Sequence, residues 1–320
     1  MTKKASWESQ DRPEGPWAIM FHHFHSVADL ANPGSINGEQ LRSMLQRVQE
    51  THTIVGPDDF LSLIGNGNKS SEFVLLTFDD ALLSQVQIAL PILSDFSLGA
   101  LFNVPSSVWT NSPPSLEIWA KFRRDAFKSF DLFYDAFLAE INSCGLGPAA
   151  DLLQGYPTDY LANFPFYSEN ERRFRFLRDK RLGADAFYQV MNQLVIKNGY
   201  SPEQLSREIW FTESDCASLL SNGSQVGLHS FSHPTQISSL SLDKQTDEYT
   251  KNFDDILRVT GVAAKFVAHP CGDYSQETLS ILAQLGIEVG FRSSPSKGGG
   301  SNLEIPREDH STLAYRMGIL

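Results

Sequence analysis

The chain has 320 residues, of which 41% are hydrophobic and 20% charged, so it can bury one large core or two small ones. Its formal net charge of -12 argues against nucleic acid or an anionic membrane as the main partner. No stretch is apolar enough to span a membrane, and residues 1–15 are polar, lack the apolar core of a secretory signal and are expected to be disordered.

Strands and helices alternate in the first third of the chain. Asn37 is a suitable N-cap, with Gln40 three residues on, for a helix that reaches about Glu50. Pro57 suits the first position of a second helix. The predicted strands cover residues 17–22, 53–55, 73–78 and 100–104, and a further helix covers 84–96. Because such alternation needs crossover connections, it predicts a mainly parallel sheet.

The alternation stops between residues 106 and 210, where the pattern is helical and rich in aromatic residues and arginine. This predicts a helical insertion of about 100 residues, a common domain size. Its arginine-rich stretch, residues 172–178, suits either an anionic sugar or diphosphate, or a solvated amphipathic face. Alternation then resumes, with strands predicted at 225–228, 265–268 and 287–291, helices at 213–220, 242–259 and 276–285, and a Gly/Ser loop at 293–302.

Two acidic residues, Asp79 and Asp80, follow the buried strand at 73–78 directly. A second short strand leads to His229 and His233, whose i, i+4 spacing lets two imidazoles chelate one cation. Two histidines and one carboxylate form the ligand set of an open metal site, which leaves the second carboxylate to act as a base. The alternative is structural, with the acids capping one helix and the histidines another.

Both motifs, Thr-Phe-Asp-Asp at 77–80 and His-Ser-x-x-His at 229–233, resemble the polysaccharide deacetylase family, the NodB-homology carbohydrate esterases. The resemblance covers about residues 17–105 and 211–312 and leaves the helical insertion unmatched. It implies a distorted seven-stranded parallel (β/α) barrel, within a deacetylase-like domain at 16–105 and 211–320. It also implies that Asp80, His229 and His233 bind a metal and that Asp79 is the catalytic base.

The third family motif is usually Arg-x-Pro-aromatic, and the corresponding stretch here is Ala-His-Pro-Cys-Gly at 268–272. The arginine that normally partners the base is therefore missing, and Arg307 either replaces it or forms an ordinary surface ion pair. The backbone N–H of Cys271 can still serve the oxyanion, because a main-chain donor does not depend on the side chain. A nucleophilic role for Cys271 has no ordered Cys/His/Asn framework to support it.

The family's general acid is a histidine in a Leu-x-His context, which has no clear match in this chain. His310 stands near the right chain position without the apolar frame. His22, at the end of the first strand, matches a histidine found there in many relatives, and His23 and His25 compete with it. Since strand ends at one rim of a barrel converge on the active site, His22 is the second candidate.

The resemblance implies one divalent metal, with zinc as first choice and nickel, cobalt, iron or manganese also tolerated by the ligand set. The three cysteines, Cys144, Cys216 and Cys271, form no zinc-ribbon or disulfide pattern, which favours a reducing cytoplasm. The expected reaction is removal of an N-acyl group, acetyl or formyl, from a sugar, such as an intracellular precursor of a surface polysaccharide. The alternatives are hydrolysis of a non-sugar amide or cyclic imide, and an inactive carbohydrate-binding protein. The oligomeric state is left open.

Overall fold

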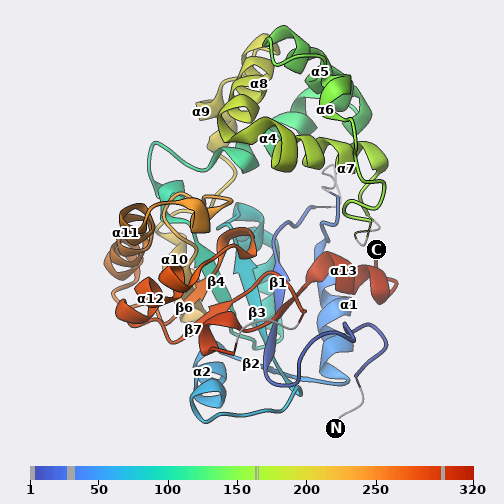
Figure 1. Cartoon of the computed structure of the whole chain (residues 1–320). Helices are drawn as coiled ribbons and strands as arrows, with labels where there is room; N and C mark the ends of the chain where they lie inside the picture. Colours follow the sequence, from blue (N-terminus) through green and yellow to red (C-terminus); the bar gives the residue numbers. More distant parts are fainter. Residues whose placement is uncertain (1–3, 27–32, 163, 165, 297–299) are drawn as a thin grey trace. The chain divides into compact units, whose positions relative to one another are not determined.

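The computed structural model describes residues 4–26, 33–162, 164, 166–296 and 300–320 (Figure 1). Residues 1–3 of the predicted disordered N-terminus and 297–299 of the predicted Gly/Ser loop lie outside the described residues. The chain divides into two compact units. One combines the described residues up to Pro114 with those from Trp210 onward, and the other is the helical unit, Ser115–Ile209. None of the helices among the described residues has the length and apolarity to cross a membrane.

The first unit is built on a parallel sheet that curls into a nearly closed barrel of seven strands, as predicted (Figure 1). The strands run in the order β7-β6-β5-β4-β3-β1-β8. Their bounds are β1 Trp17–Phe21, β3 Phe73–Asp79, β4 Leu101–Val104, β5 Gln225–Leu228, β6 Phe266–Ala268, β7 Val289–Phe291 and β8 Arg307–Asp309. An eighth strand, β2 at Thr53–Val55, pairs with the start of β3.

The barrel is closed by the segment just before β8. Strand β8 pairs with β1, and a single parallel bridge joins Ile305 to Phe291 at the end of β7. Two backbone hydrogen bonds hold this bridge, from Ile305 N to Gly290 O at 2.8 Å and from Arg292 N to Ile305 O at 2.9 Å. Strand β8 is absent from the predicted elements, because its sequence, Arg-Glu-Asp, has no apolar alternation.

The helices of this unit follow the predicted pattern. Asn37 and Gln40 form the capping box of α1, and Pro57 opens α2. The predicted helix at 84–96 begins as a π-helical turn. The bounds are α1 Gly38–Gln49, α2 Pro57–Gly65, η1 Gln85–Ala89, α3 Leu90–Asp95, η2 Ser106–Trp109, α10 Asp215–Ser221, η4 Ile237–Ser239, α11 Leu242–Thr260, η5 Pro270–Gly272, α12 Gln276–Gln284, η6 Asn302–Glu304 and α13 His310–Arg316.

The alternation of side chains along β3 sets the depth of the site. Leu75 belongs to the buried apolar cluster that also contains Ala18, Leu101 and Phe266, all from barrel strands. Because successive strand residues face opposite sides, residues 77 and 79 share the face of Leu75, one and two layers further along. Asp79 therefore stands on top of a packed apolar interior, at the carboxyl end of the strand.

Residues 4–15, which the sequence predicts to be disordered, pack on the barrel unit. Trp7 is buried with its ring centroid 5.5 Å from that of His52. Arg12 is buried between Glu8 and Glu308, and Ser9 N donates to Glu308 Oε1 at 2.9 Å. Glu308 lies on β8, almost 300 positions further along the chain. The expectation of disorder rests on the local composition of residues 1–15, which carries no information about a partner so far along the chain.

The helical unit falls within the predicted insertion at 106–210 and has an aromatic core. Phe133, Phe137, Phe174 and Phe187 are buried, and the Phe137 and Phe174 ring centroids lie 4.9 Å apart. Such ring pairs add stability beyond the burial of their area. The helices are α4 Ser115–Ala126, α5 Phe130–Ser143, α6 Ala149–Leu152, α7 Glu169–Phe176, η3 Leu177–Leu182, α8 Gly183–Lys197 and α9 Pro202–Ser206.

Candidate metal centre

Three predicted ligands, Asp80, His229 and His233, converge at the carboxyl ends of β3 and β5. Asp80 Oδ1 lies 3.4 Å from His229 Nε2 and 3.3 Å from His233 Nε2. In a tetrahedral zinc site with bonds of about 2.1 Å, neighbouring ligand atoms stand about 3.4 Å apart. The donor types and their spacing therefore fit one divalent cation.

Hydrogen bonds to His229 fix which ring nitrogen faces Asp80. Its Nδ1 lies 2.7 Å from Ala268 O, and since a carbonyl can only accept, Nδ1 carries the proton. The lone pair of Nε2 then points toward Asp80, as metal-binding histidines require. On the backbone side, His229 N donates to Asn252 Oδ1 at 2.9 Å, and Asn252 Nδ2 donates to Val104 O at 2.9 Å. Asn252 thus links the ends of β4 and β5 to α11.

The loops that carry the ligands contain left-handed backbone at residues other than glycine. The φ angles are +72° at Asp80, +57° at Ser230 and +56° at His233. Each such residue costs about 1–3 kcal/mol, and this strain is typical of functional sites. Ser230 Oγ accepts the His233 N–H at 3.1 Å and stabilises the turn.

The surrounding charges favour the protonation states that bind a cation, except at His229. Burial acts to raise the pKa of Asp80, but His233 and His229 outweigh it and hold that pKa well below its usual range. Burial lowers the pKa of His233. Burial acts the same way on His229, but Asp79 and Asp80 outweigh it and raise its pKa. Protons and metal therefore compete for this imidazole.

The second carboxylate, Asp79, is buried and paired with Arg307. The guanidinium of Arg307 donates to Asp79 Oδ1 at 2.9 Å and lies 2.8 Å from Oδ2. Burial acts to raise the pKa of Asp79, but the charges of Arg307 and His229 outweigh it and lower that pKa to about 2. Arg307 thus contacts the carboxylate whose usual arginine partner is missing, and it is buried rather than part of a surface ion pair.

Polar residues that the sequence reasoning missed complete the setting of Asp79. Asn103 Nδ2 donates to Asp79 Oδ1 at 2.8 Å, and Thr77 Oγ1 accepts from Arg307 at 3.1 Å. Gly227, beside Asn103 on β5, leaves room for this amide, because a Cβ there would stand 2.6 Å from Asn103 Oδ1. In the sequence, the signal for this polar setting is Asn103, an amide side chain within the otherwise apolar strand at 100–104.

Replacing Arg307 by Met is expected to lower the free energy of unfolding by about 3–5 kcal/mol, because Asp79 would be left buried and unpaired. Urea denaturation measures this loss, and adding Asp79→Asn to Arg307→Met should recover part of it. Arg316→Met is the matched control, since Arg316 is 39% exposed and pairs with Glu308 at 3.2 Å. Its loss should stay within about 1 kcal/mol. Equal losses in the two single variants would contradict the buried pairing.

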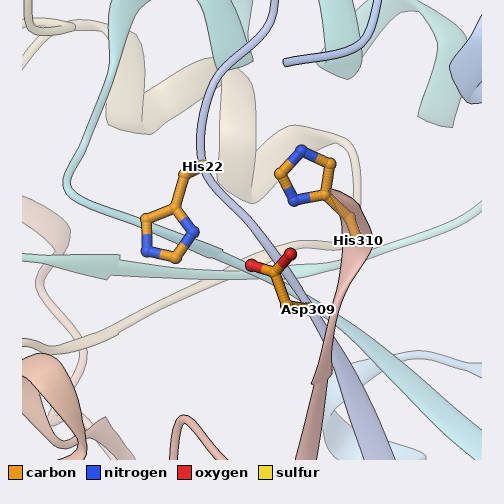
Figure 2. Close-up of side chains that lie close together, drawn as sticks. All are labelled: His22, Asp309 and His310. Atoms are coloured by element: carbon orange, nitrogen blue, oxygen red, sulfur yellow. The ribbon is translucent and has the colours of Figure 1, made fainter. Parts of the chain in front are cut away.

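The two candidate general acids lie near each other, with Asp309 beside them (Figure 2). His22 Nε2 lies 4.0 Å from Asp79 Oδ2 and 3.9 Å from Asp80 Oδ2, and its side chain is 26% exposed. His310 is buried, with Nδ1 3.1 Å from Met20 O and its ring stacked on Phe21. Burial lowers the pKa of His310 to about 4. The structure therefore brings His22 to the two carboxylates and holds His310 against the backbone of β1.

Cys271 lies in the turn η5, directly after β6, and its side chain is exposed. Its φ angle is +54°, so this turn shares the left-handed backbone of the ligand loops. His269, which stands two positions before it, is buried with Nε2 2.8 Å from Leu303 O. The histidine therefore anchors the turn to the segment before β8.

Comparison with known proteins places these observations in context. The polysaccharide deacetylase family matches residues 174–290, which include His229 and His233 and extend into the helical unit. The Streptococcus pyogenes deacetylase PplD, solved in complex with acetate, superposes with a TM-score of 0.56 at 16% identity, over 96% of this chain and 99% of that one. IcaB from Ammonifex degensii gives 0.55 at 12%, over 95% and 98%. The BpsB deacetylase domain of Bordetella bronchiseptica gives 0.51 at 13%, over 93% and 97%. No curated protein matches.

Proposed function

Because this chain is a divergent member of the polysaccharide deacetylase family, we propose that it is a metal-dependent hydrolase that removes an N-acyl group, acetyl or formyl, from a sugar. The observation that carries the proposal is the meeting of Asp79 with Asp80, His229 and His233 at one rim of the barrel. A carboxylate held ionised beside a three-ligand centre is the arrangement that amide hydrolysis by water requires.

Asp80, His229 and His233 would hold one divalent cation, with zinc as first choice and nickel, cobalt, iron or manganese compatible with the donors. When bound, the cation would supply Lewis acidity to the acyl carbonyl and a lowered pKa to the attacking water. The donor set suits this role, since the carboxylate is anionic and the bond from His229 Nδ1 to Ala268 O leaves Nε2 to bind the cation in place of a proton.

The remaining steps belong to side chains of this chain. Asp79 takes the proton of the attacking water, and Arg307 keeps it ionised for that purpose. The N–H of Cys271 donates to the oxyanion. As the carbon–nitrogen bond breaks, the leaving amine takes a proton from His22. We prefer His22 to His310 for this step because His22 is partly exposed and lies within 4.0 Å of both carboxylates, whereas His310 is buried.

Release of acetate or formate from a panel of sugars tests the proposal. Purified protein, supplied with zinc or cobalt, is offered N-acetyl and N-formyl sugars beside cyclic ureides. We expect acyl release from at least one sugar. Tight sugar binding by metal-loaded protein without release would indicate an inactive carbohydrate-binding protein. Hydrolysis confined to the cyclic ureides would indicate an imide hydrolase.

For the physiological substrate we propose an intracellular precursor of a surface polysaccharide, handled in the cytoplasm. The three cysteines, all within the described residues, form no disulfide, which suits a reducing compartment. Nucleotide-linked and lipid-linked N-acetyl sugars are therefore the first substrates to compare with finished polymer. Faster release from the polymer would contradict this choice.

The helical unit is expected to determine substrate choice. The chain leaves and re-enters the barrel unit through segments bonded to the ligand loops, since Ser107 N donates to Phe231 O at 3.0 Å and Phe211 N donates to Ala81 O at 3.0 Å. We predict that replacing residues 115–209 by a short Gly/Ser linker raises KM for oligosaccharides and leaves one metal per chain. Steady-state kinetics on monomeric and oligomeric sugars, with metal analysis, measure both. Unchanged kinetics in a folded protein would assign the unit to assembly instead.

A further inference from the structure

Three arginines of the helical unit stand against aromatic rings and form no ion pair in the described residues, and of these Arg181 donates to Gln154 O, which leaves Arg123 and Arg175. The guanidinium carbon of Arg123, on α4, lies 5.4 Å from the ring centroids of both Phe130 and Phe174. That of Arg175, on α7, lies 4.1 Å from the ring centroid of Tyr167. Both arginines are half-buried. Within the part of the chain that the structure describes, neither guanidinium forms a hydrogen bond or an ion pair with a carboxylate.

The carboxylates nearby are engaged elsewhere. Asp125, two residues after Arg123, pairs with Lys121 at 3.1 Å. Glu171 Oε2 accepts the Ser168 N–H at 2.7 Å in the capping box of α7. Asp179 pairs with Arg178 at 2.5 Å. None of these three acids forms an ion pair with Arg123 or Arg175, although the charges of Glu171 and Asp179 act to raise the pKa of Arg175, and that of Glu117 acts to raise the pKa of Arg123.

Other arginines of the 172–178 stretch already have partners. Arg172 donates to Thr158 O at 3.1 Å, and Arg173 pairs with Glu169 one turn earlier on α7. The sequence of this stretch suggests either an anion-binding site or a solvated face, and its arginines do not all belong to the same one. Arg172 and Arg173 belong to a solvated face, whereas Arg175 directly follows Phe174, whose ring Arg123 of α4 faces.

An unpaired cation among rings carries a cost that an anion would relieve. Burial lowers the pKa of Arg123 to about 10, and the charges of Arg175 and Arg178 act in the same direction. Stacking on an aromatic face leaves the N–H groups open, because they point outward in the plane of the guanidinium. Two guanidinium groups match the charge of a phosphate, which is about -1.5 to -2 at neutral pH, and each can donate two N–H groups to its oxygens.

We propose that Arg123 and Arg175 form a binding site for the phosphate group of a small phosphorylated saccharide. Arg178 adds to the positive field, and the neighbouring rings offer apolar surface to a sugar. A single carboxylate fits less well, because it would leave one of the two guanidinium charges uncompensated. The site does not depend on the deacetylase assignment, since its residues belong to the helical unit alone.

Calorimetric titration of the full chain tests the site with glucose 6-phosphate, inorganic phosphate and glucose. Arg123→Gln is compared with Arg173→Gln, which removes the same charge from an arginine that already has a carboxylate partner. We expect glucose 6-phosphate to bind wild type and Arg173→Gln alike, at least tenfold more weakly to Arg123→Gln, and glucose not to bind. Equal affinities in the two variants, or no binding to wild type, would overturn the site. Equal affinity for inorganic phosphate and glucose 6-phosphate would overturn the saccharide as its source.

Thermal unfolding supplies a second readout. Without ligand, Arg123→Gln should melt no lower than wild type, because it removes an unpaired charge. Saturating glucose 6-phosphate should raise the Tm of wild type and of Arg173→Gln and leave that of Arg123→Gln unchanged. A lower Tm of ligand-free Arg123→Gln, with no shift of wild type on adding ligand, would mean that the cation–π contacts are purely structural. Should Arg123→Gln fail to fold, Arg175→Gln takes its place in both measurements.

Discussion

Asp79→Asn is expected to lower kcat for sugar deacylation by about 10²–10⁴-fold while the protein keeps its metal. The amide cannot accept a proton from the attacking water, although it preserves the shape of the carboxylate and can still accept from Arg307. Steady-state release of acetate, with metal analysis of the same sample, measures both effects. Turnover at the wild-type level would refute the role of Asp79 as the base.

Asp80→Asn is the matched control, because it makes the same chemical change at the adjacent position. Asp80 lies 3.3–3.4 Å from both imidazoles, so its loss should remove metal and activity together. Asp79 and Asp80 are therefore separable by their metal content. If both variants kept the metal, or both lost it, the assignment of Asp79 as the base and Asp80 as a metal ligand would fail.

His229→Ala is expected to weaken metal binding by more than about 100-fold. Loss of a group that merely supports a ligand already costs about 10–100-fold, and His229 is assigned as a ligand itself. Elemental analysis after dialysis should give one divalent ion per wild-type chain and almost none per variant. Removing the metal with a chelator should abolish acyl release, and zinc or cobalt should restore it.

His25→Ala serves as the comparison, because it removes an imidazole from the loop after β1, where the ring bonds to Ser35 Oγ at 2.8 Å. Its metal content should equal that of wild type. If His229→Ala and wild type held equal amounts of metal, the assignment of Asp80, His229 and His233 as ligands would fail.

The ligand group could be predicted from sequence because its members carry local signals. Asp79 and Asp80 end an apolar run, and His229 and His233 stand four apart after a short strand. The carboxyl ends of parallel strands lie at one rim of a barrel, so the residues that follow β3 and those that follow β5 lie close together in space. The parallel sheet was predicted for a similar reason, since strands and helices alternate outside the insertion, whereas its closure into a barrel was implied only by the resemblance to the family.

The features that local patterns could not predict depend on contacts between distant segments. Arg307 meets Asp79 through a three-residue strand without apolar alternation, more than 200 positions away. The choice between His22 and His310 depends on which ring turns toward the carboxylates, and spacing carries no such information. Arg12 and Arg123 are likewise explained by what surrounds them in space, Glu308 for one and aromatic rings for the other.

Arg307, whose guanidinium pairs with Asp79, lies on β8, the strand that closes the barrel. During synthesis Arg307 is the last residue of this centre to leave the ribosome, long after Asp79, His229 and His233. Until β8 pairs with β1, Asp79 lacks its counter-charge, and the barrel stays open between Phe291 and Ile305. Pairing the first strand with the last is a contact of high sequence separation, which forms slowly. Closure of the barrel and pairing of Asp79 with Arg307 are thus a single event, which a chain that ends before β8 cannot complete.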